Sequence, residues 1–358
     1  MSGGIAQLVA IGAQDAHIVG NPQVSFFRST YKRHTNFSQT VEKQVIQGNP
    51  APNGMSTIRF ERKGDLLSFV YLAPRHGDKS FTASGWIDQI SKIELLCGGQ
   101  VIDTQDSNFS QYVAPTLMAS NFTKSVAGHG VDSDSDTTRS RFYPCRFSFC
   151  ENWQTALPLV ALQFHDVELR ITWGPNTINS GQPFDHSWEC YAHFVYLDSD
   201  ERSVLSQTPQ NMLITQVQKS TPSLNTIQDL TFNHPVKYLC AADGSDLTIA
   251  ANGNKVKLQI NGTDVTDFKY MDPHYTSVAE YYHTTASVPS STGANKKRFI
   301  YPFCLETGKL QPTGSLNFSR LDSARLVSET QVHEDDIYAV NLNILRIESG
   351  MGGLMYSN

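Results

Sequence analysis

The chain has 358 residues, 39% of them hydrophobic, and this is enough to bury one large core or two medium ones. Only 17% are charged while 10% are aromatic, which excludes intrinsic disorder and, with 24 glycines and 16 prolines, favours a β-rich protein with many turns. The net charge of −6, with only two short basic clusters at Arg28/Lys32/Arg33 and Lys296/Lys297/Arg298, argues against a direct nucleic-acid partner, which requires a basic stripe.

Residues 1–24 are expected to form an arm outside the main fold. Their composition is small and apolar, without two-residue alternation, and they end at Asn21-Pro22, a break in regular structure. An aromatic and basic run follows, from Phe26 to Arg33. The arm is therefore predicted to serve contacts between subunits, and the alternative is a disordered terminus without a role.

Apolar and polar residues alternate with a period of two in three segments, Thr57–Arg62, Val167–Trp173 and Tyr338–Ile344. This period predicts strands with one buried and one wet face. In the last segment Asn341 and Asn343 lie on the wet side. Helical periodicity is scarce, and its best candidates are short pieces near Ser107–Tyr112 and Ser277–Tyr282.

An internal repeat is the most informative feature of the sequence. Three segments of the first half recur in the same order in the second half, at an offset of about 160 residues, the size of a whole domain. The matched pairs are Lys92–Val101 with Lys255–Val265, Ser110–Tyr112 with Ala279–Tyr281, and Arg141–Pro144 with Arg298–Pro302. In the first pair an alternating strand runs into Gly-Gly or Asn-Gly, which are hairpin-turn dipeptides.

The repeat predicts an all-β protein made of two tandem eight-stranded jelly-roll β-sandwiches, a double jelly roll, with few short helices. Residues 25–204 would form the first jelly roll and residues 205–358 the second. The join is expected near Asp198–Arg202, which runs into Thr208-Pro209.

Two patterns resemble metal sites, and neither is complete. The spacing of His186, Cys190 and His193 suits zinc, but a fourth ligand is missing, and on an alternating strand positions 190 and 193 face opposite ways. The run Asp132–Asp136 opens like a calcium loop, but the later Gly and Glu of that motif are absent. No metal is expected.

No catalytic residue and no cofactor site can be named. The sequence lacks the H-x-H pair of metal-binding jelly rolls, the G-x-S-x-G elbow, the Walker loop and G-x-G-x-x-G. The six cysteines are scattered, which is typical of buried thiols in a reducing compartment. The protein is therefore expected not to be an enzyme.

A lectin-like, carbohydrate-binding jelly roll is the rival interpretation. Tryptophans at sandwich loops can stack on sugars, and Trp86, Trp153, Trp173 and Trp188 are the candidates. Trp173, however, continues an alternating buried face, and core packing is the expected role for most of the four.

Three segments resemble the major capsid proteins of the nucleocytoplasmic large DNA viruses, of the phycodnavirus and iridovirus type. They are Gly12–Phe37, Ala156–Val167 and the C-terminal Ser349–Asn358, so the resemblance spans essentially the whole chain. It implies a structural shell protein of the virion that homotrimerises into pseudo-hexameric capsomers of an icosahedral capsid. The chain is short for this family, which leaves a minor capsid paralogue as an alternative.

The resemblance also implies partners and a place of assembly. These are neighbouring capsomers, minor capsid or scaffold proteins and, through the arm, an inner membrane, with assembly in the host cell cytoplasm. The segment after the arm is expected to anchor the chain at the capsomer base. Its contact residues are predicted to be Phe26, Phe27, Arg28, Tyr31, Lys32, Arg33, His34 and Phe37.

Overall fold

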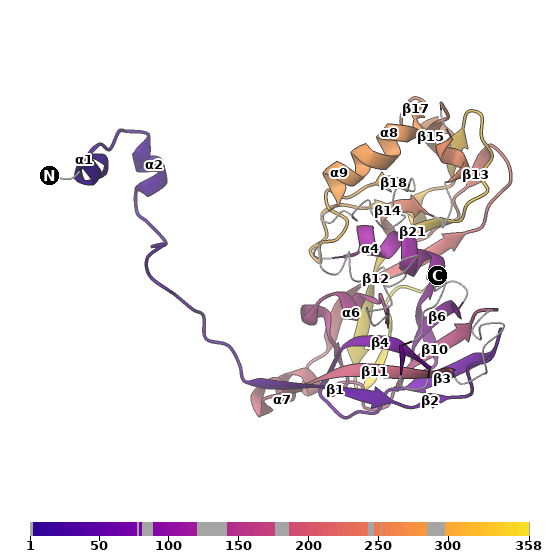
Figure 1. The fold of residues 1–358 in the computed structure, drawn as a ribbon, viewed down its shortest axis with the longest axis horizontal. Coiled ribbons are helices and arrows are strands. Elements are labelled where there is room, and N and C mark those ends of the chain that lie inside the picture. Colours follow the sequence, from indigo (N-terminus) through magenta and orange to yellow (C-terminus); the bar gives the residue numbers. More distant parts are fainter. Residues whose placement is uncertain are drawn as a thin grey trace. The chain divides into compact units, whose positions relative to one another are not determined.

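The computed structural model describes residues 3–76, 79–80, 89–119, 142–175, 186–242, 247–251, 253–284 and 298–357. The chain divides into two units, Met1–Asn36 and Phe37–Asn358. The first unit contains two short helices, α1 (Gly3–Val9) and α2 (Asp15–Val19), and then a stretch without helix or strand (Figure 1). These two helices were not predicted from the sequence.

The first half of the second unit is a sandwich of two antiparallel sheets (Figure 1). One sheet has the order β1-β11-β4-β5, with β8 and β9 also paired to β4, and the other has the order β2-β3-β10-β6-β7. The strands are β1 (Phe37–Gln44), β2 (Ile46–Gln47), β3 (Met55–Arg59), β4 (Leu66–His76), β5 (Lys79–Ser80), β6 (Ile90–Cys97), β7 (Gln100–Asp106), β8 (Tyr143–Pro144), β9 (Leu157–Pro158), β10 (Val167–Trp173) and β11 (His186–Leu197).

The second half repeats this architecture. One sheet has the order β12-β21-β14-β18, with β19 paired to β14 and β22 to β21, and the other has the order β13-β20-β15-β16, with β17 paired to β15. The strands are β12 (Gln210–Ser220), β13 (Ile227–Asp229), β14 (Pro235–Ala241), β15 (Lys255–Ile260), β16 (Thr263–Asp264), β17 (Lys269–Tyr270), β18 (Phe299–Pro302), β19 (Leu316–Asn317), β20 (Ala324–Ser328), β21 (Ile337–Glu348) and β22 (Met351–Leu354).

The strand orders of the two halves correspond strand by strand. The path β1-β11-β4-β8 matches β12-β21-β14-β18, and β3-β10-β6-β7 matches β13-β20-β15-β16. Each half thus has the eight principal strands of a jelly roll. The predicted duplication and the predicted double jelly roll are confirmed, and we call the two halves the first and second barrel.

The repeated hairpins have the turn geometry that their sequences predict. Gly98 and Gly99 join β6 to β7 with φ of +57° and +83°, and Asn261 and Gly262 join β15 to β16 with φ of +49° and +76°. Positive φ at both central residues is the requirement of a type I′ turn, which matches the twist of the flanking strands.

Both predicted helical segments are helical, and they have the same form in the two barrels. In the first barrel a π-helical turn, η1 (Phe109–Val113), runs into α4 (Ala114–Leu117). In the second barrel η4 (His274–Val278) runs into α9 (Ala279–His283). The remaining short helices are α6 (Ser148–Glu151), η2 (Trp153–Thr155), η3 (Thr248–Ala250), α8 (Met271–Pro273) and η5 (Phe318–Arg320).

The segment between the barrels forms one more helix, α7 (Ser199–Gln207), where the sequence analysis expected only a join. Asp198 is its N-cap and accepts a hydrogen bond from the Ser199 N–H at 2.7 Å. Asp200 and Glu201 in the first turn complement the helix dipole. These residue types at a helix start are a local signal that could have been used.

Of the three predicted strands, Val167–Trp173 is confirmed as β10, with strictly alternating burial. The prediction for Thr57–Arg62 is wrong at its end, because β3 stops at Arg59. Arg62 lies beyond the strand, and its guanidinium donates to the carbonyl oxygen of Gln163 at 2.7 Å.

The strand predicted at Tyr338–Ile344 is confirmed as part of β21, but the prediction that Asn341 and Asn343 face water is wrong. Both residues are buried in β21, which lies between β12 and β14. Their amide groups are satisfied internally, because Gln218 Nε2 donates to Asn341 Oδ1 and Asn343 Nδ2 donates to Gln216 Oε1, each at 2.9 Å. The amide side of this strand is therefore enclosed by the protein, whereas Leu342 and Ile344 on the opposite side are half-buried.

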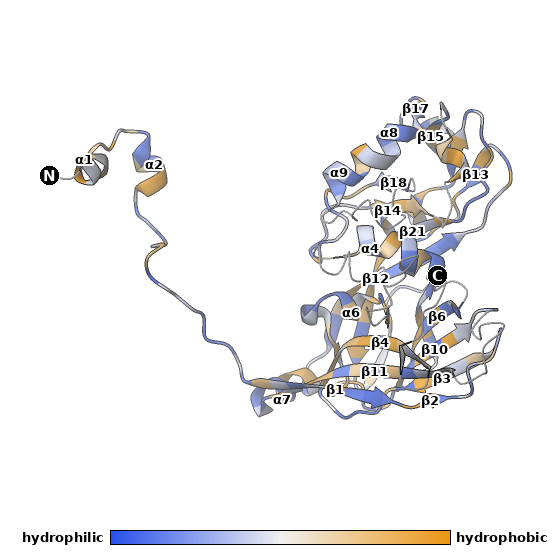
Figure 2. Cartoon of the chain, viewed as in Figure 1, coloured by the Kyte–Doolittle hydropathy of each residue, from blue (hydrophilic) through white to orange (hydrophobic). Residues whose placement is uncertain are grey.

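Each barrel has its own core, and a third apolar cluster joins them. Hydrophobic residues follow the strands of both sandwiches in Figure 2. Leu345 and Ile347 of β21 and Ile214 of β12 belong to the first core, although both strands are paired in a sheet of the second barrel. The long β12–β21 pair thus contributes to both barrels.

Candidate assembly surfaces

The eight residues predicted as assembly contacts are all exposed. Phe26 to His34 lie in the first unit, where the side chain of Phe26 is 92% exposed. Phe37 is separate from them, because it opens β1 and pairs with Leu197 at the edge of the first barrel. Their role at a capsomer base stays a prediction.

The helices of the first unit also carry exposed apolar side chains. Leu8 and Val9 of α1 and Ile18 and Val19 of α2 are all exposed. No helix in the described part of the chain is long and apolar enough to cross a membrane. The exposed apolar side chains of this unit lie on two short helices and on the stretch that follows them.

The seam between the barrels is an apolar contact of a helix with a sheet. Phe109, Val113 and Leu117 from η1 and α4 of the first barrel pack with Tyr238 of β14 and Tyr338 of β21 in the third cluster. All five side chains are fully enclosed. Because β14 also faces the second core, it is buried on both faces.

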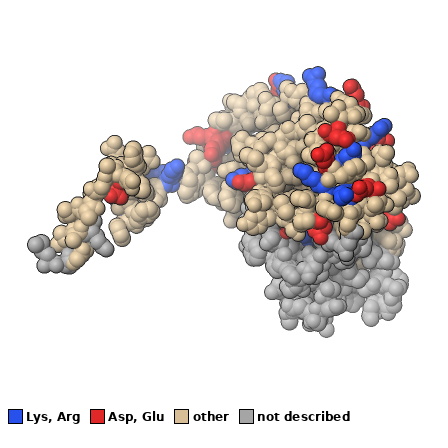
Figure 3. Space-filling view, turned by 90° about the horizontal axis from the view of Figure 1, so that it is seen from above, with Lys and Arg blue, Asp and Glu red and all other residues tan. Residues whose placement is uncertain are grey.

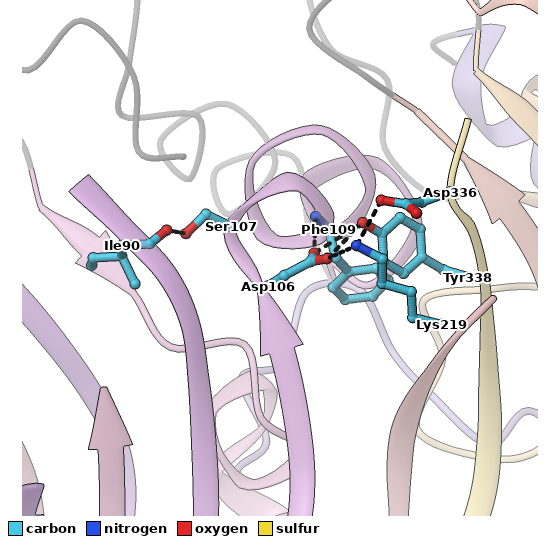
Figure 4. Close-up of polar contacts among 7 residues, drawn as sticks. All are labelled: Ile90, Asp106, Ser107, Phe109, Lys219, Asp336 and Tyr338. Atoms are coloured by element: carbon cyan, nitrogen blue, oxygen red, sulfur yellow. Dashed lines mark hydrogen bonds and ion pairs between the residues drawn. The ribbon is translucent and has the colours of Figure 1, made fainter. Parts of the chain in front are cut away.

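A polar network borders this apolar contact (Figure 4). The Asp106 carboxylate at the end of β7 accepts hydrogen bonds from the Phe109 N–H at 2.8 Å and from the Tyr338 hydroxyl at 2.8 Å. Lys219 Nζ from β12 lies 3.0 Å from Asp106 and 2.6 Å from Asp336. Burial raises the pKa of Tyr338, and the charge of Asp106 raises it further, so the phenol stays a donor.

Asp103 links the same two strands deeper in the seam. Its carboxylate accepts from the Val217 N–H of β12 at 2.9 Å, from the Thr104 N–H at 3.0 Å and from Gln105 Nε2 at 2.8 Å. Burial raises the pKa of Asp103 to about 7, although the three donors oppose this. The barrels are thus fixed to each other by side-chain and backbone bonds as well as by apolar packing.

A cluster of aromatic side chains covers the outer face of the sheet β1-β11-β4. Tyr71 stacks on Tyr191 with ring centroids 5.3 Å apart and meets Phe142 edge-on at 5.7 Å. Phe69 stacks on His193 at 4.4 Å. We call these five residues the aromatic face, and Phe69 and Phe142 on it are 38% and 36% exposed.

Cys190 and His193 are the two residues of the zinc-like pattern whose side chains the structure describes, and these side chains do not come together. Cys190 is fully buried in the first core, whereas His193 lies on the aromatic face and its Nε2 is 3.1 Å from Gln39 Oε1. The prediction that these side chains face opposite ways is confirmed. Among the described side chains no three His, Cys, Asp or Glu residues gather as metal ligands. The calcium-like run at 132–136 lies outside the described residues.

The tryptophans and cysteines belong mainly to the interior. Trp173 and Trp188 are buried, with ring centroids 5.1 Å apart, whereas Trp153 is exposed and Trp86 lies outside the described residues. Five cysteines are buried and Cys150 is half-buried. Burial raises the thiol pKa of Cys97 to about 11 and of Cys190 to about 12. The buried thiols are therefore protonated and unreactive at neutral pH.

Charges of both signs are mixed on the face of the protein seen in Figure 3. Of the two basic clusters, Arg28, Lys32 and Arg33 are exposed in the first unit. In the second cluster Arg298 is buried, and its Nε donates to the Tyr112 carbonyl oxygen at 3.0 Å. Arg298 therefore stabilises the fold through this hydrogen bond and is not exposed to a ligand.

The aromatic face was not predicted from the sequence. A signal was present, because Leu67–Leu72 reads as a nearly continuous apolar run instead of an alternating one. Such a run is typical of a strand whose two faces are both covered. The covering partner of the outer face is not visible in a single sequence.

Comparisons with known proteins agree with this architecture. Residues 25–200 match the family model of the major capsid protein N-terminus, and residues 249–353 match that of the large eukaryotic DNA virus major capsid protein. The chain is 34% identical to the major capsid protein of Pyramimonas orientalis virus and 30% identical to that of Paramecium bursaria Chlorella virus 1, with full coverage of both chains in each case.

A solved structure has the same fold. The quasi-atomic model of the PBCV-1 virus capsid superposes with a TM-score of 0.75 over 93% of this chain and 100% of the other, at 24% identity. With matches that begin near the N-terminus and end near the C-terminus, the chain belongs to the family of major capsid proteins of large eukaryotic DNA viruses.

Proposed function

We propose that this protein is a shell subunit that forms homotrimers, and that these trimers are the pseudo-hexameric capsomers of an icosahedral virion. The observation that carries the proposal is the pair of equivalent barrels fixed together by a shared apolar cluster. Three such chains around a threefold axis present six similar barrels. A closed ring of six similar barrels has a nearly hexagonal outline, and such units can tile a flat facet.

Residues 1–24 act in this proposal as an arm between building blocks. Their exposed apolar side chains contact minor capsid or scaffold proteins, or an inner membrane, and the aromatic and basic residues between Phe26 and Phe37 anchor the chain at the capsomer base. Residues 25–204 and 205–358 are the two structural domains of the subunit. Assembly takes place in the host cell cytoplasm, and the protein performs no catalysis, uses no cofactor and binds no nucleic acid directly.

A minor capsid paralogue with the same fold is the second candidate, supported by the short length of the chain relative to its family. Copy number per virion distinguishes the two, since a major subunit dominates the protein mass of purified particles. A lectin-like role has weaker support, because the exposed Trp153 is the one described tryptophan that a sugar could reach.

Light scattering on a size-exclusion peak tests the proposal. A homotrimer gives three times the chain mass of 39.8 kDa, and negative-stain images of that peak show a hexagonal outline. Obligate interfaces of such assemblies bury more than ~2,000 Å², so the trimer persists on dilution. A monomer at micromolar concentration contradicts the proposal.

A further inference from the structure

The internal duplication assigns corresponding positions in the two barrels. Tyr71 of β4 pairs with Pro144 of β8, and Tyr238 of β14 pairs with Pro302 of β18. Because β4 corresponds to β14 and β8 to β18, Tyr71 and Tyr238 occupy the same place on the outer faces of equivalent sheets. The aromatic face of the first barrel therefore corresponds to the sheet face that lies in the seam of the second.

These two equivalent faces differ in what covers them. On the second barrel the side chain of Tyr238 is fully buried, in a cluster that includes side chains of η1 and α4 of the first barrel. On the first barrel the face around Tyr71 carries Phe69, Phe142 and Val41 at 38%, 36% and 44% exposure. Tyr238 is therefore packed against a helix, whereas among the described residues the equivalent face around Tyr71 keeps part of its aromatic surface exposed.

In the second barrel, the helix η4–α9 corresponds to η1–α4, and it exposes side chains at positions that are buried in η1–α4. The π-to-α junction falls at Val113-Ala114 in the first barrel and at Val278-Ala279 in the second, so these positions correspond. The match of Ser110–Tyr112 with Ala279–Tyr281 predicted from the sequence is four residues out of this structural register. Ala114 and Ala279 are buried alike. Val113 is 1% exposed but Val278 is 40% exposed.

The same contrast recurs one turn further along the helix. Leu117 is 1% exposed, whereas the corresponding Tyr282 is 71% exposed and its neighbour Tyr281 is 79% exposed. The two tyrosine rings lie edge to face at 4.9 Å. Three large apolar or aromatic side chains thus form an open helix face at the positions that in η1–α4 cover a sheet.

We propose that the open helix face of Val278, Tyr281 and Tyr282 packs on the aromatic face of a second copy of this chain. The contact repeats, between copies, the helix-on-sheet seam that joins the two barrels within a copy. It is a head-to-tail contact, which generates a ring if the rotation closes. In the proposed trimer, three copies with two barrels each form a ring of six barrels. The inference therefore rests on the proposed trimer and assigns the surfaces through which its subunits meet.

The rim of the aromatic face is polar and suits an interface. Lys43 Nζ lies 2.7 Å from Glu189 Oε1, and the Tyr191 hydroxyl donates to Glu189 Oε2 at 2.9 Å. A polar rim around an aromatic centre is the usual composition of a protein interface. Tyrosine at the centre of such a contact is among the residue types that contribute most to binding.

Substitution of the helix face is the first test. The full chain with Tyr281→Asp and Tyr282→Asp should keep the circular dichroism and melting temperature of a folded protein but lose trimer at least tenfold in light scattering. Tyr270→Asp, which changes an exposed tyrosine of the same barrel, is the matched control and should remain trimeric. A trimeric double variant overturns the proposed surface while leaving the trimer intact, and a monomeric wild-type protein overturns the proposed function itself.

Cross-linking of mixed variants is the second test, and it does not depend on loss of assembly. Tyr282→Cys and Phe142→Cys chains are mixed, reassembled and treated with a short bismaleimide. The mixture should give cross-linked dimers, while each variant alone and the wild-type protein, whose cysteines are buried or half-buried, should not. Absence of cross-links from trimers that contain both variants contradicts the proposed contact.

Discussion

At the scale of single residues, Asp106 concentrates the polar contacts of the seam. Its carboxylate accepts hydrogen bonds from the Phe109 N–H, the Tyr338 hydroxyl and the Lys219 ammonium group. These donors come from both barrels. A buried donor that loses its acceptor costs more than an exposed one, because water cannot replace the lost partner.

Asp106→Ala is therefore expected to lower the free energy of unfolding by about 1–3 kcal/mol, since it removes the carboxylate acceptor of two enclosed donors, the Phe109 N–H and the Tyr338 hydroxyl. Asp264→Ala is the matched control, because Asp264 forms an exposed ion pair with Lys257 at 2.7 Å and should cost less than ~1 kcal/mol. Urea unfolding of both variants measures the difference. Equal effects would show that the seam network adds nothing to stability.

At the scale of secondary-structure elements, the two type I′ hairpins have the same local geometry and different surroundings. A Cβ added at Gly98 would lie 2.3 Å from Nδ1 of His165, whereas a Cβ at Gly262 meets nothing within 4 Å. His165 also holds the C-terminal strand, because its Nδ1 is 2.8 Å from the Gly352 carbonyl oxygen.

The two glycine-to-alanine variants separate backbone strain from packing. Gly262→Ala should cost about 1–2 kcal/mol, the price of positive φ for an L-residue. Gly98→Ala should cost more, because His165 must also move away from Gly352. Thermal unfolding compares the two, and a Gly98→Ala variant as stable as Gly262→Ala would contradict this account.

The helices show how one element type takes two roles. The segments η1–α4 and η4–α9 have the same π-to-α form in the two barrels. The first lies in the seam, and the second has its aromatic side chains exposed. Local structure is therefore shared between the repeats, while the partner of each helix differs.

At the scale of the whole molecule, the first unit is separate from the cores. In the described chain no residue before Phe37 belongs to any of the three apolar clusters. Folding of the two barrels should therefore not depend on this unit, and its exposed apolar side chains remain available for assembly.

Deletion of residues 2–20 should leave the trimer and its melting temperature nearly unchanged and should block shell formation. Light scattering and differential scanning calorimetry follow the trimer, and electron microscopy of assembly reactions follows the shells. Loss of the trimer would assign the arm to the fold. Complete shells from the truncated chain would remove its assembly role.

The sequence by itself determined the fold class, the duplication and the hairpin turns. These features depend on local rules, namely the two-residue period of a half-buried strand and the positive φ that Gly and Asn tolerate. For this reason β10 and the turns at Gly98-Gly99 and Asn261-Gly262 agree with prediction residue by residue.

Only the tertiary structure decided which strand faces are covered. The amides of Asn341 and Asn343 look solvent-facing in sequence, yet they are enclosed because β21 is a central strand that contributes to both barrels. The open helix face likewise became visible only when equivalent positions in the two barrels were compared, and the apolar run Leu67–Leu72 indicates a covered outer face without identifying what covers it. Burial by a distant part of the chain is a long-range contact, and local periodicity does not identify the partner.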